Sequence, residues 1–269
     1  MSTRAEEYVA DVLRREQLTP HLVRLTLGGD GLAGFTSTGI PDEWIGLVVP
    51  GQFQSRYYTV RSWDGSELVL DVVVHDVGLV TEWASGDCVG DRVTITAPKG
   101  SFAMPDDAQW LLLVGDLTAL PAMARIAHER AGAVPTRIVA EVPDDPEQLS
   151  GYLPADLDVT WHEPPVVEEA PRGRHETSRL AELVESTEWP EGAGYFWMAG
   201  ESAQMRAIRK HLMRVVKLPS SHYDVMGYWR AVEARQPRRV DPGPIWRAGK
   251  AAGKTDEQIW ADYDEAAQQ

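Results

Sequence analysis

The run Arg56-Tyr57-Tyr58-Thr59-Val60-Arg61 has the aromatic and β-branched content of a β-strand. Residues two apart in a strand point to the same face, so Arg56 and Tyr58 are expected to reach the same ligand. Arginine pairs with phosphate through two N–H groups. The Tyr58 ring can stack on a planar group, and the hydroxyl or N–H of Thr59 can bond a ring nitrogen. A strand with a solvated aromatic face has the same composition, so the surrounding sequence must decide between these interpretations.

Residues 1–107 have the pattern of a small all-β domain. Short apolar or alternating segments separated by turn residues lie at 8–13, 22–27, 44–49, 57–62, 68–74 and 93–96. Trp63-Asp64-Gly65-Ser66 between two of them indicates a hairpin. One helical turn within 78–85 would present backbone N–H groups to an anion. Six strands without long helices predict a closed six-stranded antiparallel barrel.

Residues 108–240 have a different pattern, which predicts an α/β domain. Apolar strands are expected at 110–114, 137–142, 159–161, 195–199 and 223–226, and helices at 120–131, 178–186 and 201–216. This alternation predicts a parallel sheet with helices on its faces. In the last helix a stripe expected to pack on the sheet consists of Ala207, Ile208, Leu212, Val215 and Val216. Residues 241–269 are expected to form a tail with a final helix starting near Thr255.

The composition restricts the class of partner. The 269-residue chain has 41 acidic and 26 basic residues, a formal net charge of -15, which disfavours nucleic acid and anionic membranes. No run reaches the roughly 18 apolar residues of a membrane span, and the N-terminus has no apolar signal region, so a cytoplasmic location is expected. The single cysteine, Cys88, is expected to be a buried, inert thiol. The spacing of the histidines matches no metal site.

Seven segments, in chain order, resemble signatures of the siderophore-interacting proteins, which are FAD-dependent ferric-siderophore reductases of the ferredoxin-NADP reductase superfamily. They are Arg56–Arg61, Val74-His75 with Gly78 and Trp83-Ala84, Gly90-Asp91, Ala97–Phe102, Gly115–Ala122, Trp197–Glu201 and Gly227–Arg230. The chain departs from the family pattern in two places. Leu79-Val80 replaces Pro-Ala, and Leu117 replaces a glutamate.

The resemblance implies an FAD site in the barrel and a nicotinamide site in the α/β domain. The residues that it assigns to FAD are Arg56, Tyr57, Tyr58, Thr59, Asp71, Val73, His75, Gly78, Val80, Thr81 and Trp83. Those assigned to the nicotinamide side are Asp116, Thr118 and Ala119, and Tyr228 and Trp229 are expected to return near the flavin. No catalytic side chain and no protein metal ligand is implied, because the flavin carries the electron chemistry.

The implied reaction is reduction of Fe(III) in a hydroxamate or catecholate siderophore by a monomeric enzyme. NADPH, NADH or a reduced ferredoxin would supply the electrons. The acidic run Ala140–Asp145 favours NADH, although Arg137 or Arg206 would still reach a 2′-phosphate. An electron-transfer reductase for a protein partner and a binding module without catalysis are the alternatives.

A basic pocket is expected for the anionic substrate. The candidate residues are Lys210, Arg214, Arg230, Arg247, Lys250 and Lys254. The last three belong to the C-terminal tail, which would form one wall of the substrate pocket near the flavin. An ordinary amphipathic tail that packs on the body is the alternative interpretation.

Overall fold

The structure is a computed structural model of the chain, and it describes residues 6–52, 54–75, 78–130, 132–165, 178–230 and Gln258. The chain divides into two compact units, residues 1–231 and 232–269. Apart from Gln258, the predicted tail, with Arg247, Lys250 and Lys254, lies outside the described residues. No helix among the described residues is long and apolar enough to cross a membrane.

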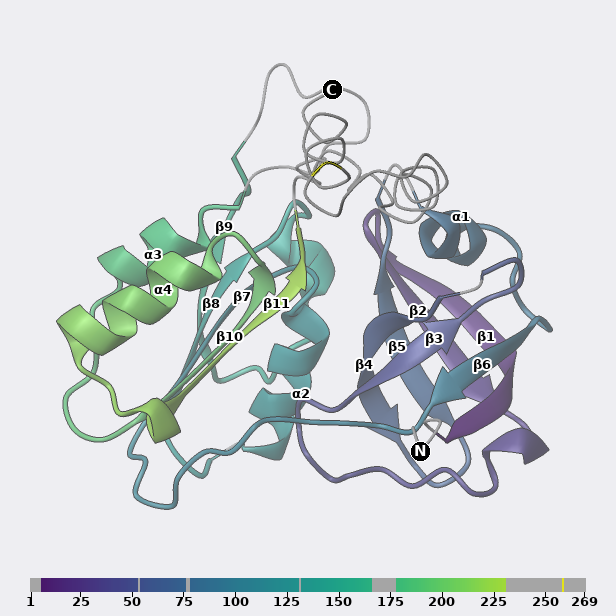
Figure 1. Ribbon diagram of the computed structural model, residues 1–269, viewed down its shortest axis with the longest axis horizontal. Helices are drawn as coiled ribbons and strands as arrows, with labels where there is room; N and C mark the ends of the chain where they lie inside the picture. Colours follow the sequence, from purple (N-terminus) through teal and green to yellow (C-terminus); the bar gives the residue numbers. More distant parts are fainter. Residues whose placement is uncertain are drawn as a thin grey trace. The chain divides into compact units, whose positions relative to one another are not determined.

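Six strands close into the predicted antiparallel barrel (Figure 1). They are β1 (Glu7–Thr19), β2 (Leu22–Gly28), β3 (Trp44–Val48), β4 (Arg56–Trp63), β5 (Leu68–Val73) and β6 (Arg92–Thr96), in the order β1-β2-β5-β4-β3-β6. The 3-10 helix η1 (Asp30–Leu32) follows β2, and α1 (Leu79–Ser85) follows β5. Alternate residues such as Leu25, Leu70 and Ile95 point inward and are fully buried.

The hairpin predicted between β4 and β5 is present. The Asp64 carboxylate accepts hydrogen bonds from the backbone N–H groups of Ser66 and Glu67, at 2.8 and 2.7 Å. These two bonds satisfy donors that the strand ladder leaves unpaired at the turn. The hairpin fixes β4 beside β5, with Val60 opposite Leu70.

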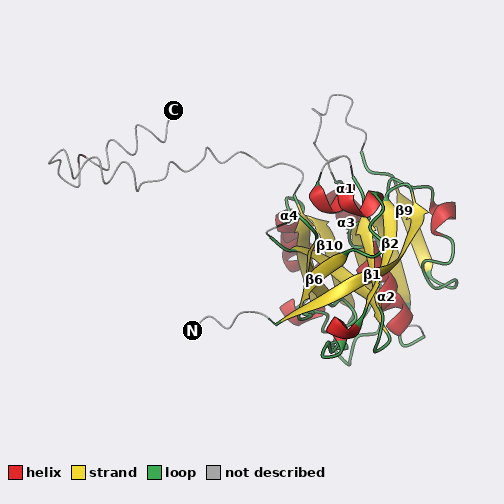
Figure 2. Ribbon diagram, turned by 90° about the vertical axis from the view of Figure 1, so that its right-hand side faces the viewer, coloured by secondary structure: helices red, strands yellow, loops and turns green. Residues whose placement is uncertain are grey.

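The second half contains a five-stranded parallel sheet in the order β11-β10-β7-β8-β9. Its strands are β7 (Leu111–Asp116), β8 (Thr136–Glu141), β9 (Asp158–His162), β10 (Tyr195–Glu201) and β11 (Tyr223–Trp229). The connecting helices are α2 (Leu120–Glu129), η2 (Pro146–Leu149), α3 (Leu180–Ser186), α4 (Met205–His211), η3 (Leu212–Val216) and η4 (Ser220–His222). Figure 2 shows the strands of both halves in yellow, with α1 at one end of the barrel strands.

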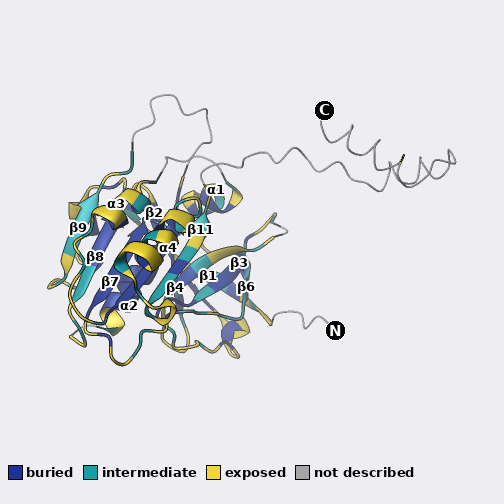
Figure 3. Cartoon of the chain, turned by 60° about the vertical axis from the view of Figure 1, so that its left-hand side comes forward, coloured by how far each residue is buried: buried dark blue, intermediate teal, exposed yellow. Residues whose placement is uncertain are grey.

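The two faces of the parallel sheet carry different helices. Leu111 and Leu113 of β7 share a core with α2, whereas Leu112 and Val114 share another with α3 and α4. The outer sides of α3 and α4 are exposed, and the strands behind them are buried (Figure 3). The first core also contains Leu22 and Phe102, so α2 lies on the barrel side of the sheet.

The predicted helix over 201–216 differs from the structure. Glu201 ends β10, α4 begins at Met205, and the last turn is the π-helical segment η3. A π-turn has more residues per turn than an α-helix and shifts the side chains after it. Val215, within this segment, is therefore 66% exposed. Ile208 and Leu212 are buried as predicted, whereas Ala207 of α4 is exposed.

Candidate functional site

The start of β4 and the end of β5 lie at the same end of the barrel. The two strands run antiparallel with Val60 opposite Leu70. Arg56, Val73 and His75 are therefore brought to this end, and α1 follows directly after it in the chain. The structure thus gathers most of the residues that the sequence assigns to FAD.

The side chains of β4 are available to different degrees. Arg56 is exposed, and its only hydrogen bond within the described part of the chain is a 3.5 Å contact with the Ser55 carbonyl. Tyr57 is 70% exposed. Tyr58 is half-buried against the barrel core, and burial raises the pKa of its hydroxyl to about 12, with nearby Arg56 opposing the shift. The Arg56 guanidinium, with most of its N–H groups unbonded among the described residues, therefore lies near the neutral ring of Tyr58.

Helix α1 offers backbone donors rather than side chains. Val80 and Thr81 are buried, whereas the first N–H groups of a helix have no partner within it. Gly78 precedes α1 with φ +146°, and a Cβ there would lie 3.3 Å from Cε1 of His75. Leu79-Val80 keeps the backbone donors although it replaces the family's Pro-Ala. Trp83 donates a 2.8 Å bond to Asp91, which fixes α1 to the barrel.

Asp71 lies at the junction between the two halves. Its buried carboxylate accepts bonds from Arg24 at 2.7 and 2.8 Å and from the Tyr152 hydroxyl at 2.5 Å. The Arg61 guanidinium lies over the Tyr152 ring, 5.3 Å from its centroid. The structure therefore pairs Asp71 of β5 with Arg24 of β2, and the Tyr152 hydroxyl joins this pair to the α/β half.

Asp116 ends β7, at the place where the strand order of the sheet reverses between β7 and β10. The carboxyl ends of the strands at this place are the usual ligand edge of a parallel sheet. Its carboxylate accepts the N–H and hydroxyl of Thr118, at 2.9 and 2.5 Å. Burial raises its pKa, and these bonds oppose the shift. Gly200 of β10 has φ +155°, and a Cβ there would lie 2.7 Å from Asp116 Oδ2. Ala119 is buried at the start of α2.

Tyr228 and Trp229 connect this edge to the barrel. The Trp229 indole donates a 2.6 Å bond to Asp116. The Tyr228 hydroxyl is buried and makes no hydrogen bond to the described residues, although Thr59 lies close enough to lower its pKa, which burial raises well above the usual range. The adjacent residues Tyr228 and Trp229 of β11 thus reach both halves, since Tyr228 lies near Thr59 of β4 and Trp229 is bonded to Asp116 at the end of β7. Leu117, at the position of the family's glutamate, is buried in the core with α2.

A cavity of about 540 Å³ lies beside the ends of β8 and β9. Its lining residues are Val142, Pro143, Asp144, Asp145, Pro146, Trp161, His162 and Glu163. Buried Asp144 accepts a bond from Thr19 and contacts His21 Nδ1, at 2.5 and 2.7 Å. Asp145 accepts the N–H of Glu147 at 2.9 Å. Both aspartates thus have structural partners, and exposed Glu163 is a further carboxylate in the lining.

The predicted substrate cations are separated in the structure. Lys210 and Arg214 are exposed on α4 and η3, which cover the face of the sheet opposite α2. Arg230 is exposed directly after β11 and next to Trp229 in sequence. The structure brings only Arg230 of these three to the end of a strand at the candidate site.

Sequence reasoning missed Asp42 and Glu43, which precede β3 and are both fully buried. Asp42 accepts bonds from the N–H of Ser101 and of Phe102 and, at 3.1 Å, from the indole of Trp197. Glu43 binds Arg125 of α2 at 2.8 Å. The sequence signal that could have found them is a pair of adjacent acidic residues directly before an apolar strand, which suggests that both are buried with partners.

Comparisons with known proteins cover both halves. The family model described as siderophore-interacting FAD-binding domain matches residues 11–55 and 51–102. The model described as siderophore-interacting protein matches residues 108–232.

Two relatives and one solved structure match along most of their length. The NADPH-dependent ferric-chelate reductase of Escherichia coli is 28% identical over 264 residues, which cover 88% of this chain and 91% of the relative. Ferric vibriobactin reductase ViuB of Vibrio cholerae is 24% identical, covering 82% and 88%. The crystal structure of a siderophore utilization protein from T. fusca has a TM-score of 0.70 at 28% identity, covering 85% and 94%. The chain belongs to the siderophore-interacting protein family.

Proposed function

We propose that the protein is an FAD-dependent reductase that reduces Fe(III) in ferric siderophores with electrons from a reduced pyridine nucleotide. The observation that carries the proposal is the place of β11, whose Tyr228 lies near Thr59 of β4 and whose Trp229 donates to Asp116. This strand connects the predicted flavin strand to the ligand edge of the parallel sheet. The names of the E. coli and V. cholerae relatives support the same reaction.

The donor set at the end of the barrel fits FAD. The Arg56 guanidinium has N–H groups available for a pyrophosphate, and the start of α1 adds backbone N–H groups, which also favour an anion. Tyr58 supplies an aromatic surface, and Thr59, which follows it in the strand, is buried with its side chain on the opposite face. When bound, FAD would accept two electrons from the nucleotide and pass them singly to iron.

The protein's own part in the reaction is binding and orientation. The chelated iron is the substrate, and Fe(II) binds hydroxamates and catecholates poorly, so reduction releases it. Among the predicted substrate cations that the structure describes, Arg230 is the one at this edge, where it would attract an anionic siderophore. The tail residues Arg247, Lys250 and Lys254 remain predicted contributors.

The donor is proposed to be NADH or NADPH, because the parallel sheet presents an open ligand edge and a neighbouring cavity. A nucleotide donor also fits the expected cytoplasmic location. A reduced ferredoxin and a monomeric state remain predictions. Comparing NADH, NADPH and reduced ferredoxin as donors in one anaerobic assay tests the choice.

The experiment that tests the function begins with the purified protein and FAD. The protein is expected to bind FAD and, mixed anaerobically with a nucleotide and a ferric hydroxamate or catecholate, to yield Fe(II) captured by a selective chelator. Failure to bind FAD would reject the proposal. Flavin reduction without captured Fe(II) would instead favour a protein electron acceptor.

A further inference from the structure

We propose that Arg125 is a positioning residue, which holds the backbone of β4 at a fixed place relative to α2 and so sets the approach of the nucleotide to the flavin. The inference rests on the proposed function. Arg125 touches neither ligand; it would act through Val60, which follows Thr59 in the strand assigned to FAD.

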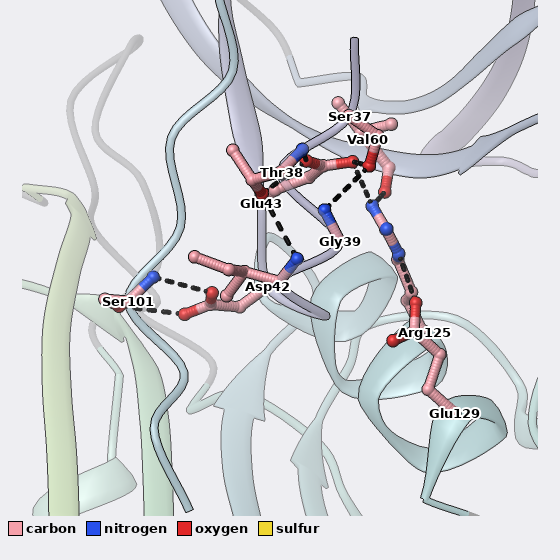
Figure 4. Close-up of polar contacts among 10 residues, drawn as sticks. Ser37, Thr38, Gly39, Asp42, Glu43, Val60, Ser101, Arg125 and Glu129 are labelled. Atoms are coloured by element: carbon pink, nitrogen blue, oxygen red, sulfur yellow. Dashed lines mark hydrogen bonds and ion pairs between the residues drawn. The ribbon is translucent and has the colours of Figure 1, made fainter. Parts of the chain in front are cut away.

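The contacts of Arg125 form a closed ring of three residues. Arg125 Nη1 donates to the Val60 carbonyl and to Glu43 Oε1, both at 2.8 Å. The Val60 N–H in turn donates to the Glu43 carbonyl at 2.9 Å. Both polar groups of the Val60 backbone are therefore bound within the ring. Figure 4 shows Arg125 reaching from α2 to Glu43 and Val60.

The ring is held by a buried ion pair. The Glu43 carboxylate is fully buried and also accepts bonds from Ser37 and Thr38, at 2.6 to 2.7 Å. These donors and Arg125 lower its pKa although burial opposes the shift. Arg125 Nε donates to Glu129 at 2.8 Å, which fixes the guanidinium on α2. A buried charged pair held by this many hydrogen bonds has little freedom to move.

The position of Arg125 links two predicted ligand sites. Helix α2 begins at Leu120, directly after Asp116, Thr118 and Ala119 on the nucleotide side. Other links between the halves involve a side chain of β4, a side chain of β5 or the end of β1. They are Arg61 with the Tyr152 carbonyl, Asp71 with the Tyr152 hydroxyl, and Asp144 with Thr19. Among the described residues, Arg125 is the α/β side chain that donates directly to a backbone carbonyl of β4.

Hydride transfer is sensitive to distances of this kind. A displacement of about 1 Å caused by a change far from the reacting atoms can slow a reaction by about 100-fold. Releasing β4 from α2 should therefore slow flavin reduction by the nucleotide, while FAD keeps its contacts with the end of the barrel.

The test compares three variants of the full chain, each loaded with FAD. Arg125→Met breaks the ring but leaves a buried carboxylate, so Glu43→Gln/Arg125→Met is the variant expected to fold well. Its glutamine can still accept from Thr38 and is neutral. Tyr152→Phe is the matched control, because it removes a buried hydrogen bond between the two halves that does not reach the β4 backbone.

Two readouts separate positioning from a general loss of structure. The rate constant of flavin reduction at saturating NADPH or NADH should fall about 10- to 100-fold in the double variant, with FAD affinity unchanged and Tyr152→Phe near wild type. Hydrogen exchange at the Val60 amide should be faster in the double variant than in Tyr152→Phe. Wild-type rates of reduction and of Val60 exchange in a folded double variant would overturn the inference.

The two proposals fail in different ways. Wild-type protein whose flavin no nucleotide reduces would reject the nucleotide as donor, and the exchange measurement would still test the role of Arg125. A slower double variant matched by an equally slow Tyr152→Phe would assign the effect to the whole junction and reject the specific role of Arg125.

Discussion

Trp229 and Asp116 are joined by a 2.6 Å hydrogen bond from the indole N–H to the carboxylate. The bond connects the end of β11 to the end of β7, at the edge where a parallel sheet binds its ligands. Asp116 is buried, and burial outweighs its hydrogen bonds to raise its pKa above 3.8. The ligand edge therefore contains a carboxylate whose charge costs free energy to keep buried.

This carboxylate predicts a dependence of stability on pH. With a raised pKa, the folded protein binds more protons than the unfolded chain between 3.8 and the folded-state pKa, so the stability contributed by Asp116 falls as pH rises through that window. Asp116→Asn should remove this loss. Urea unfolding from pH about 4 to about 7 should show the variant gaining stability relative to wild type. Parallel curves would contradict the prediction, and exposed Asp106→Asn is the control.

Arg56 is predicted to anchor the FAD pyrophosphate. Arg56→Ala should weaken FAD binding by about 1.5–3 kcal/mol, the scale of hydrogen bonds to a charged group. Fluorescence titration of the apoprotein with FAD measures the change. Arg92→Ala is the matched control, because Arg92 is an exposed barrel arginine that pairs with Asp11. Equal affinities in both variants would show that Arg56 is not the anchor.

The buried pair of Arg125 and Glu43 predicts a large effect on stability. Arg125→Met should destabilise the fold by about 3–5 kcal/mol, because it leaves an uncompensated buried charge. Glu43→Gln/Arg125→Met should recover most of this loss, since neither partner is then charged. Denaturant unfolding of the two variants checks the prediction. A double variant as unstable as the single one would mean that the buried charge is not the cause.

Donor preference is predicted to depend on the charge in the cavity beside β8 and β9. A 2′-phosphate in this cavity would lie near exposed Glu163. Glu163→Arg should therefore raise the ratio of kcat/KM for NADPH over NADH by about fivefold, the scale of an exposed ion pair. Glu182→Arg on α3 makes the same charge change away from the cavity. An equal effect of both variants would indicate a general electrostatic change.

The C-terminal tail is predicted to form part of the substrate pocket. Deletion of the residues after Asp241 should raise KM for a ferric siderophore and leave FAD bound, because only the cations of the tail are lost. Steady-state kinetics with a ferric hydroxamate and the absorbance of bound flavin measure the two effects. Kinetics identical to those of the full chain would exclude this role.

The architecture was predictable because its patterns are local. Alternation in the first half and fully apolar runs such as 111–114 in the second half determine which surfaces must be buried. The end of the helix after β10 was not predictable in the same way. Its sequence continues an apolar stripe, and only the π-turn after Leu212 turns Val215 outward.

The junction between the halves could not be predicted from the sequence. Arg125 and Glu43 are 82 residues apart, and Asp42 and Trp197 are 155 apart. No local pattern pairs charges over such distances. The same limit applies to the contacts of Asp71. The resemblance assigns this residue to FAD, and in the structure it is hydrogen-bonded to Arg24 and Tyr152, which are 47 and 81 residues away. Arg56 and Tyr58, in contrast, lie in one strand with a fixed geometry.

The most direct test of the central claim is an anaerobic assay of the full chain loaded with FAD, mixed with NADPH or NADH, a ferric siderophore and a chelator selective for Fe(II). We predict that the flavin is bleached on addition of nucleotide, reoxidised by the ferric siderophore, and that Fe(II) accumulates. A protein that takes up no FAD, or a flavin that the ferric siderophore leaves reduced with no Fe(II) captured, would contradict the proposed function.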